Sequence, residues 1–364
     1  MKKIILVVGA RPNFMKAAPL YRHLRKQNNL NVILLHTGQH YDYEMSQIFF
    51  EDLDLPKPDY FLDVQSGSHA KQTAKIMVKF EKVLLKEKPD MVVVFGDVNS
   101  TVACSLTAKK MQIVIAHVEA GLRSYDETMP EEINRRVTDS ISDLLLTPSE
   151  DANVNLLKEG VDKEKIFLVG NIMIDSLVVV INKIKDETKI LKKLKLEAKE
   201  YCLVTIHRPS NVDNEEILAE IVSKLNEVSE KIPVVFPVHP RTRKHLQDWK
   251  IKIGSKILLT SPLGYRDFTC LERNSRLVIT DSGGIQEETT FLNIPCLTLR
   301  PNTERPITIQ MGTNKLVTEK SLLNEVEFVL NNNNKKGKIP ALWDGKTALR
   351  ISEILIQKLL VNQT

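Results

Sequence analysis

The residues from Thr280 to Glu288 have the types and spacing needed to bind a nucleotide diphosphate. They read Thr-Asp-Ser-Gly-Gly-Ile-Gln-Glu-Glu and lie between two short apolar runs. Gly283 and Gly284 let the backbone approach an oxyanion, and the free N–H groups of a following helix then face phosphate. Glu288, about one turn later, would repel phosphate but suits the hydroxyls of a ribose. A glycine turn before a solvated acidic helix is the alternative interpretation of the Ser-Gly-Gly segment alone.

Further charged residues follow apolar runs in the first half of the chain. Arg11 and Lys16 come just after the first run, where they are either clamps for an anion or ordinary surface charges. Asp97 and Glu119 follow two later runs, and Glu131 opens a helix. Each acid alone has a structural alternative, since Asp caps helices and the helix dipole favours acids in the first turn. Three acids at one edge of a sheet together indicate acid–base chemistry.

His207 and His239 each stand at the end of an apolar run in the second half. A metal site could be drawn from these two histidines and an acid, but no helical or loop pair of histidines has the spacing of metal ligands, and His36 and His40 span a glycine turn. The turn after the first run also lacks the G-x-G-x-x-G pattern of dinucleotide folds. We therefore expect neither a metal ion nor a nicotinamide cofactor.

The elements that must position these residues are short, continuous apolar runs separated by helical patterns. Such runs are typical of strands buried on both faces of a parallel sheet. The first series comprises Ile4–Val8, Val32–Leu35, Met91–Phe95, Ile113–Ala116, Leu144–Leu146 and Ile166–Val169, and the second comprises Cys202–Ile206, Val234–Val238, Ile257–Leu259, Leu277–Ile279 and Cys296–Leu299.

Two series of strands in 364 residues predict two domains. The predicted class is α/β, with two doubly wound Rossmann-like domains that face a central cleft. We expect the N-terminal domain over residues 1–171 and the C-terminal domain over 172–345. The last segment, 346–364, reads as an amphipathic helix that crosses back to the first domain.

Composition excludes several classes of function. The formal net charge of +5 is small and scattered, whereas a nucleic-acid groove needs a concentrated basic face. No stretch approaches 18 apolar residues, so we expect no membrane segment, and the initial run is too short for a signal peptide. The four cysteines are far apart and mostly lie within apolar runs, which indicates reduced core thiols and a cytoplasmic location.

Taken as a set, these residues resemble the non-hydrolysing UDP-N-acetylglucosamine 2-epimerase family. The matching motifs occur in family order along nearly the whole chain: Gly9–Pro12, Thr37–His40, Phe95–Asp97, His117–Arg123, Pro130–Glu132, Asn134-Arg135, His207-Arg208, Asp281–Glu288 and Thr303–Pro306. The resemblance implies a glycosyltransferase-B type architecture and a homodimer. It also implies interconversion of UDP-GlcNAc and UDP-ManNAc without an added redox cofactor.

The resemblance further implies roles for individual residues. Those expected to bind the UDP part are Arg11, Lys16, His207, Phe268, Ser282, Gly283, Gly284, Glu288 and Arg305. Asp97, Glu119 and Glu131 would serve the sugar and its proton transfers, with His207 near the diphosphate and Arg135 also in contact with the UDP-sugar. The reaction would expel UDP as the C2 proton leaves, and a closed domain would hold the resulting 2-acetamidoglucal. A proton would then add to the other face of C2 while UDP returns to C1, which inverts the configuration at C2.

Departures from the family pattern concern a second, activating UDP-GlcNAc site. Relatives with such a site often have His-Arg-Arg-Glu-Asn where this chain has His-Arg-Pro-Ser-Asn. Its candidate residues are Gln39, His40, Arg208 and His239. Alternatives for the activity are epimerisation of another UDP-N-acetyl sugar, such as a 2,3-diacetamido uronic acid, a hydrolysing epimerase, a glycosyltransferase of the same fold, and a noncatalytic UDP-sugar sensor.

Overall fold

The computed structural model describes residues 1–38, 53–184, 186, 188–331 and 336–361. The chain divides into two compact units. Unit 1 comprises Met1–Val178 and Ala341–Thr364, and unit 2 comprises Val179–Pro340. The boundary expected after residue 171 falls at the start of helix α7 (Ile172–Lys183), which continues through the division between the units.

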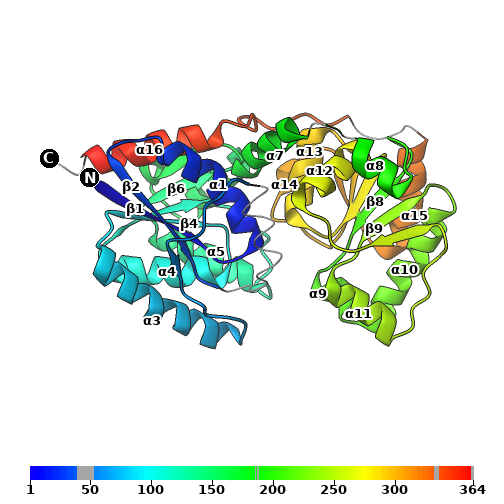
Figure 1. Ribbon diagram of the computed structural model, residues 1–364, viewed down its shortest axis with the longest axis horizontal. Coiled ribbons are helices and arrows are strands. Elements are labelled where there is room, and N and C mark those ends of the chain that lie inside the picture. Colours follow the sequence, from blue (N-terminus) through cyan, green and yellow to red (C-terminus); the bar gives the residue numbers. More distant parts are fainter. Residues whose placement is uncertain (39–52, 185, 187, 332–335, 362–364) are drawn as a thin grey trace. The chain divides into compact units, whose positions relative to one another are not determined.

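Unit 1 is built on a seven-stranded sheet whose order is β3-β2-β1-β4-β5-β6-β7, and every pairing among these described strands is parallel. Its strands are β1 (Lys2–Val8), β2 (Leu30–His36), β3 (Tyr60–Phe61), β4 (Met91–Phe95), β5 (Val114–Val118), β6 (Leu144–Thr147) and β7 (Ile166–Leu168). Strand β4 is buried along its whole length, as expected for a sheet covered on both faces. Figure 1 shows the helices on the two sides of this sheet.

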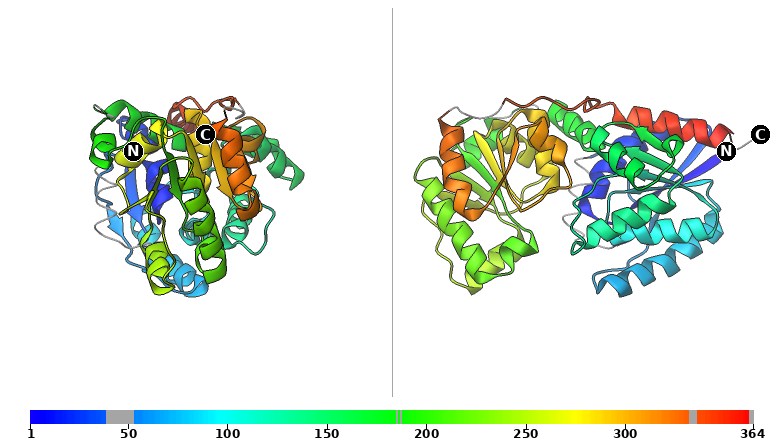
Figure 2. Two further views of the ribbon diagram at one scale, coloured as in Figure 1. Left: turned by 90° about the vertical axis from the view of Figure 1, so that its right-hand side faces the viewer. Right: turned by 180° about the vertical axis from the view of Figure 1, so that it is seen from behind.

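The helices of unit 1 include one from the end of the chain. They are α1 (Arg11–Leu24), α3 (His69–Glu87), α4 (Asn99–Lys110), α5 (Pro130–Ile141), α6 (Glu150–Lys158), the 3₁₀ turn Lys163–Lys165, α7 and α16 (Thr347–Val361). Helix α16 packs against α1 (Figures 1 and 2). Two contacts fix its approach: Trp343 Nε1 donates to the Pro148 carbonyl at 3.0 Å, and Asp175 accepts from the N–H groups of Thr347 and Ala348.

Unit 2 has a six-stranded parallel sheet with the order β10-β9-β8-β11-β12-β13. Its strands are β8 (Cys202–Thr205), β9 (Val234–Pro237), β10 (Ile257–Thr260), β11 (Leu277–Thr280), β12 (Cys296–Leu299) and β13 (Asn314–Val317). Its helices are α8 (Thr188–Leu194), α9 (Pro209–Val212), α10 (Glu215–Ser229), α11 (Pro240–Asp248), α12 (Tyr265–Asn274), α13 (Gly283–Leu292), α14 (Pro306–Gln310) and α15 (Glu319–Leu330).

Each sheet has one topological switch point, where the strand order reverses. It lies between β1 and β4 in unit 1 and between β8 and β11 in unit 2. Ligands in open parallel sheets bind beyond the carboxyl ends of the strands at such a point. The predicted class, two doubly wound α/β domains, is confirmed. Among the described residues, no helix combines the length and apolar character needed to cross a membrane.

Candidate functional site

In unit 1, a buried ion pair lies at the switch point. Lys16 on α1 contacts the carboxylate of Glu119, which directly follows β5, and each side chain is only 6% exposed. Glu119 has a φ of 72°, a left-handed conformation that a non-glycine residue adopts only where its surroundings impose it. Gly96 follows β4 at a φ of 62°, and a Cβ there would lie 3.1 Å from both the Glu119 Oε2 and the Lys16 Nζ atoms. Glycine is therefore required beside this pair.

The turn between β1 and α1 is held by Asn13, a residue to which the sequence interpretation gave no role. Its Oδ1 atom accepts from the N–H groups of Gly9 and Ala10 at 3.1 Å, and its Nδ2 atom donates to the Phe95 carbonyl at 3.0 Å. Arg11 occupies the first position of α1. The turn is thereby joined to the end of β4, across the switch point.

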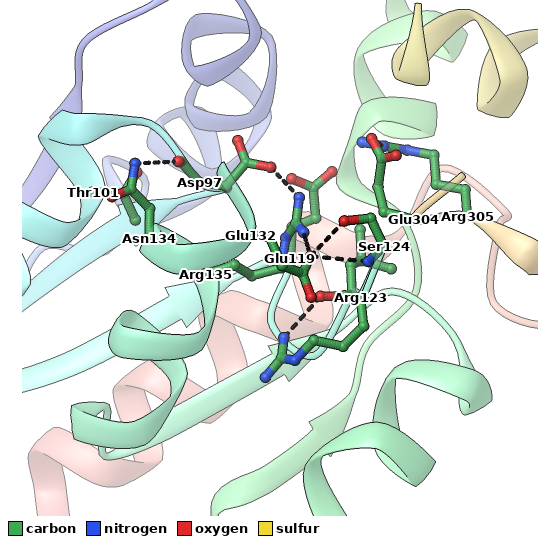
Figure 3. Close-up of polar contacts among 12 residues, drawn as sticks. Asp97, Thr101, Glu119, Arg123, Ser124, Glu132, Asn134, Arg135, Glu304 and Arg305 are labelled. Atoms are coloured by element: carbon green, nitrogen blue, oxygen red, sulfur yellow. Dashed lines mark hydrogen bonds and ion pairs between the residues drawn. The ribbon is translucent and has the colours of Figure 1, made fainter. Parts of the chain in front are cut away.

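Asp97 belongs to a second ion-paired group. The guanidinium of Arg135, only 2% exposed, contacts Asp97 with one nitrogen atom and donates to Glu132 at 2.7 Å with another (Figure 3). Glu132 also accepts from the N–H and hydroxyl groups of Ser124, each at 2.9 Å. The neighbouring Glu131 is exposed in the first turn of α5. The structure thus brings Asp97 and Arg135 together, while Glu132 is the acid that faces the protein interior.

Behind this edge lies a buried group that sequence interpretation missed. The His117 ring contacts Asp139 through Nδ1 and the Gly96 carbonyl through Nε2, both at 2.7 Å. Arg123 Nη1 donates to Asp139 at 2.7 Å and its other nitrogen atoms donate to Glu159. Burial alone would raise the pKa of Asp139, but His117 and Arg123 outweigh it and hold that pKa below its usual range. Both ring nitrogens of His117 therefore face oxygen atoms of the protein.

In unit 2, the glycine turn (residues 281–284) joins β11 to α13. Ser282 is the N-cap residue of α13, and among the described residues its side chain makes no capping hydrogen bond. Ser282, Gly283 and Gly284 are half-buried, so the first N–H groups of the helix lie near the surface. A Cβ on Gly283 would lie 2.5 Å from Arg305 Nη1. This turn has the open helix N-terminus and nearby cation of an anion site.

Arg305 is fixed by two carboxylates. Its Nε atom lies 2.9 Å from Glu287, and Nη1 contacts Glu304. Glu304 is also 2.8 Å from Arg300 and 3.9 Å from Arg208, the N-cap residue of α9. Three arginines therefore gather beside the glycine turn, and each contacts at least one of these two acids.

Asp281 connects the glycine turn to the end of β8. Its carboxylate accepts from the N–H groups of His207 and Arg208 at 2.9 and 2.8 Å and from the Asn211 amide, and it lies 3.1 Å from the His207 Nδ1 atom. Burial alone would raise the pKa of Asp281, but these partners outweigh it and lower that pKa. The His207 side chain is nevertheless 46% exposed.

The remaining predicted residues have varied surroundings. Phe268 on α12 and Glu288 on α13 are buried. His239, the exposed N-cap residue of α11, has its ring centroid 6.2 Å from that of His207. Gln39 and His40 lie outside the described residues, as does the Arg11 side chain. The structure therefore groups Lys16 with Glu119, Asp97 with Arg135, and His207 with His239.

Comparisons with known proteins identify the family of this chain. The family model described as UDP-N-acetylglucosamine 2-epimerase matches residues 22–356. The chain belongs to the UDP-N-acetylglucosamine 2-epimerase family. A crystal structure of the Methanocaldococcus jannaschii UDP-GlcNAc 2-epimerase in complex with UDP-GlcNAc and UDP is similar, with a TM-score of 0.90 and 44% identity over 98% of this chain and all of the other. The predicted family membership is confirmed.

Two relatives of this chain are named for different UDP-sugars. A UDP-N-acetylglucosamine 2-epimerase homolog of Methanococcus maripaludis is 49% identical over 90% of this chain and 92% of its own length. A UDP-2,3-diacetamido-2,3-dideoxy-D-glucuronate 2-epimerase of Pseudomonas aeruginosa is 42% identical over 86% of this chain and 88% of its own length. Membership of this family is therefore compatible with more than one UDP-sugar.

Proposed function

We propose that this enzyme interconverts UDP-GlcNAc and UDP-ManNAc by inverting C2 of the sugar. The observation that carries the proposal is the buried Lys16–Glu119 pair at the switch point of unit 1. A carboxylate held by a neighbouring cation, on a backbone that fixes its direction, suits removal of a proton from carbon. Unit 2, taken by itself, has a helix N-terminus beside Arg305, an arrangement that suits a diphosphate.

The proposed reaction is an elimination followed by an addition. A carboxylate takes the C2 proton, the C–H electron pair becomes the C1–C2 double bond, and the C1–O bond breaks so that UDP leaves with its electron pair. The resulting 2-acetamidoglucal is protonated on the other face of C2 while UDP returns to C1. Glu119, Asp97 and Glu131 are the candidate proton carriers, and His207, Arg305 and the glycine turn are the candidate partners of the departing diphosphate.

The experiment is proton NMR of the purified protein with UDP-GlcNAc in deuterated water, without added nicotinamide or metal. We expect UDP-ManNAc to accumulate and deuterium to appear at C2 of both sugars. Free UDP together with free ManNAc would identify a hydrolysing epimerase. No change over the time in which the enzyme turns over another substrate would contradict the proposal.

A second substrate deserves the same measurement, because a UDP-2,3-diacetamido-2,3-dideoxy-D-glucuronate 2-epimerase is 42% identical to this chain. Comparing kcat/KM for this uronate and for UDP-GlcNAc assigns the sugar. We expect the neutral sugar to be the better substrate. A preference for the uronate of tenfold or so, about 1.4 kcal/mol, would reassign the enzyme within its family.

A homodimer and a cytoplasmic location complete the proposal. The family resemblance supports the dimer. All four cysteines, Cys104, Cys202, Cys270 and Cys296, are buried free thiols, which supports a reducing compartment. Light scattering of the purified protein tests the dimer, and a particle of about 41 kDa would contradict it.

A further inference from the structure

Glu288 does not act alone behind the glycine turn. It lies five residues after Gly283 and is only 2% exposed. The hydroxyl group of Tyr265, the first residue of α12, donates to Glu288 Oε1 at 2.9 Å. One oxygen atom of the Glu288 carboxylate is therefore fixed from the neighbouring helix.

A second carboxyl group faces Glu288 from the same helix. Glu272 lies seven residues after Tyr265, and residues at this spacing share one face of a helix. It is completely buried, and its carboxyl group lies close enough to that of Glu288 for the two to interact electrostatically. Within the part of the chain that the structure describes, no amide, hydroxyl or cationic group donates to either oxygen atom of Glu272.

Two carboxyl groups can hydrogen-bond only if one of them carries a proton. Glu288 receives the Tyr265 hydroxyl and so is better suited to be the ionised partner, whereas Glu272 is surrounded without donors. Burial, followed by the charge of Glu288, raises the pKa of Glu272 well above its usual range. We therefore place the proton on Glu272, from where it can form a hydrogen bond to the ionised carboxylate of Glu288.

We propose that Glu272 is a protonated positioning residue that orients Glu288 for the ribose hydroxyls of the nucleotide. A carboxylate has about four lone-pair directions, and the two donors from α12 occupy two of them. These two neighbours restrict the direction in which the carboxylate can accept hydrogen bonds from a pair of sugar hydroxyls. This inference rests on the proposed function, since it concerns how the UDP part is bound.

The test compares binding of UDP and of 2′-deoxy-UDP by calorimetry in wild type, E272Q and E272M. The glutamine amide can still donate to Glu288, whereas methionine has a similar size but no donor. We expect wild type to prefer UDP by about tenfold, because a hydrogen bond to a charged group is lost with the hydroxyl. In E272Q the ratio of the UDP affinity to the 2′-deoxy-UDP affinity should stay within about twofold of the wild-type ratio. In E272M this ratio should fall toward one.

A matched control and two contrary outcomes make the test decisive. C270A changes another buried side chain of α12 and should leave the preference unchanged. If E272M retains the full preference, the positioning role of Glu272 is wrong while the proposed function stands. If wild type does not bind UDP at all, the proposed function fails, and this inference fails with it.

The pH dependence of stability tests the proton on Glu272 even if E272M does not fold. Elements packed against Glu272 place three titratable groups near it: Glu288 on α13, Tyr265 on α12 and Cys296 on β12. Helix α8, which also packs against α12, contributes Ile190 and Leu191 to the adjacent core and exposes its lysines.

The raised pKa of Glu272 determines whether stability rises or falls with pH. Above pH ~4.3 the unfolded chain releases this proton and the folded protein retains it, so wild type loses stability as pH rises. E272Q has no such proton. We expect the melting temperature of wild type to fall relative to that of E272Q between pH 5 and 8, and a constant difference would overturn the assignment of the proton.

Discussion

Unit 1 and unit 2 both bring polar residues to the carboxyl ends of two adjacent strands at a switch point, β1 and β4 in one and β8 and β11 in the other. In unit 1 this edge carries the carboxylates of Glu119 and Asp97, which are paired with Lys16 and Arg135. In unit 2 it carries the backbone N–H groups of the glycine turn and the guanidinium of Arg305, which is paired with Glu287 and Glu304. The same topology thus supports opposite charges, and the strand-end residues decide the chemistry.

The largest effect is expected when a carboxylate of unit 1 is removed. E119Q should lower the rate of C2 proton exchange on the order of a thousandfold, because the amide cannot accept the proton. The Kd for UDP should change little, since the glycine turn is in the other unit. NMR in deuterated water and calorimetry measure the two quantities. E127Q, at an exposed acid of the same unit, is the control, and unchanged exchange in E119Q would refute the role of Glu119.

The second effect concerns the buried cluster of Asp139, His117 and Arg123 in unit 1. D139N removes the countercharge of buried Arg123 and a hydrogen-bond partner of His117, and should lower the free energy of unfolding by about 3 kcal/mol at pH 7. Because the folded pKa of Asp139 is depressed, its contribution is present above pH ~3.9 and disappears as pH falls through the folded value. Urea unfolding measures the loss. Equal midpoints for D139N and the exposed-site control D162N would show that the cluster does not stabilise unit 1.

The smallest effect is expected from a substitution in the glycine turn of unit 2, beside Arg305. In G283A the new Cβ would meet Arg305 Nη1 at 2.5 Å and Glu304 Oε1 at 2.9 Å, so the arginine must move away from the glycine turn. UDP affinity should fall about tenfold, or ~1.4 kcal/mol. G67A is the control, because a Cβ there meets no described atom within 4 Å. Equal UDP affinity in both variants would remove Arg305 and the turn from the binding site.

Sequence alone predicted the strands whose burial is uniform. Runs such as Met91–Phe95 and Leu277–Ile279 coincide with β4 and β11, because central parallel strands are apolar on both faces. Strand β13, Asn314–Val317, was missed, since its buried Asn314 and exposed Lys315 break the apolar pattern of an edge strand. Placing Glu119 and His207 at strand ends followed from the same strand predictions.

The supporting residues could not be predicted in this way. Asp139 lies 22 residues from His117, and nothing in the local pattern joins them. Glu272 precedes Glu288 by 16 residues, and only the packing of α12 against α13 makes the two carboxyl groups neighbours. The choice between Glu131 and Glu132 as the inward-facing acid depends on the rotation of α5 about its axis, which adjacent acids leave undetermined.

The return of the chain to unit 1 has a consequence for biosynthesis. Unit 2 is one continuous segment, whereas unit 1 is completed only by residues after Pro340, which supply Trp343 and α16. A ribosome delivers the N-terminal part first, at about 5–20 residues per second. Unit 2 can therefore finish folding while unit 1 still exposes the apolar surface of α1, which makes the nascent N-terminal half a candidate client for chaperones.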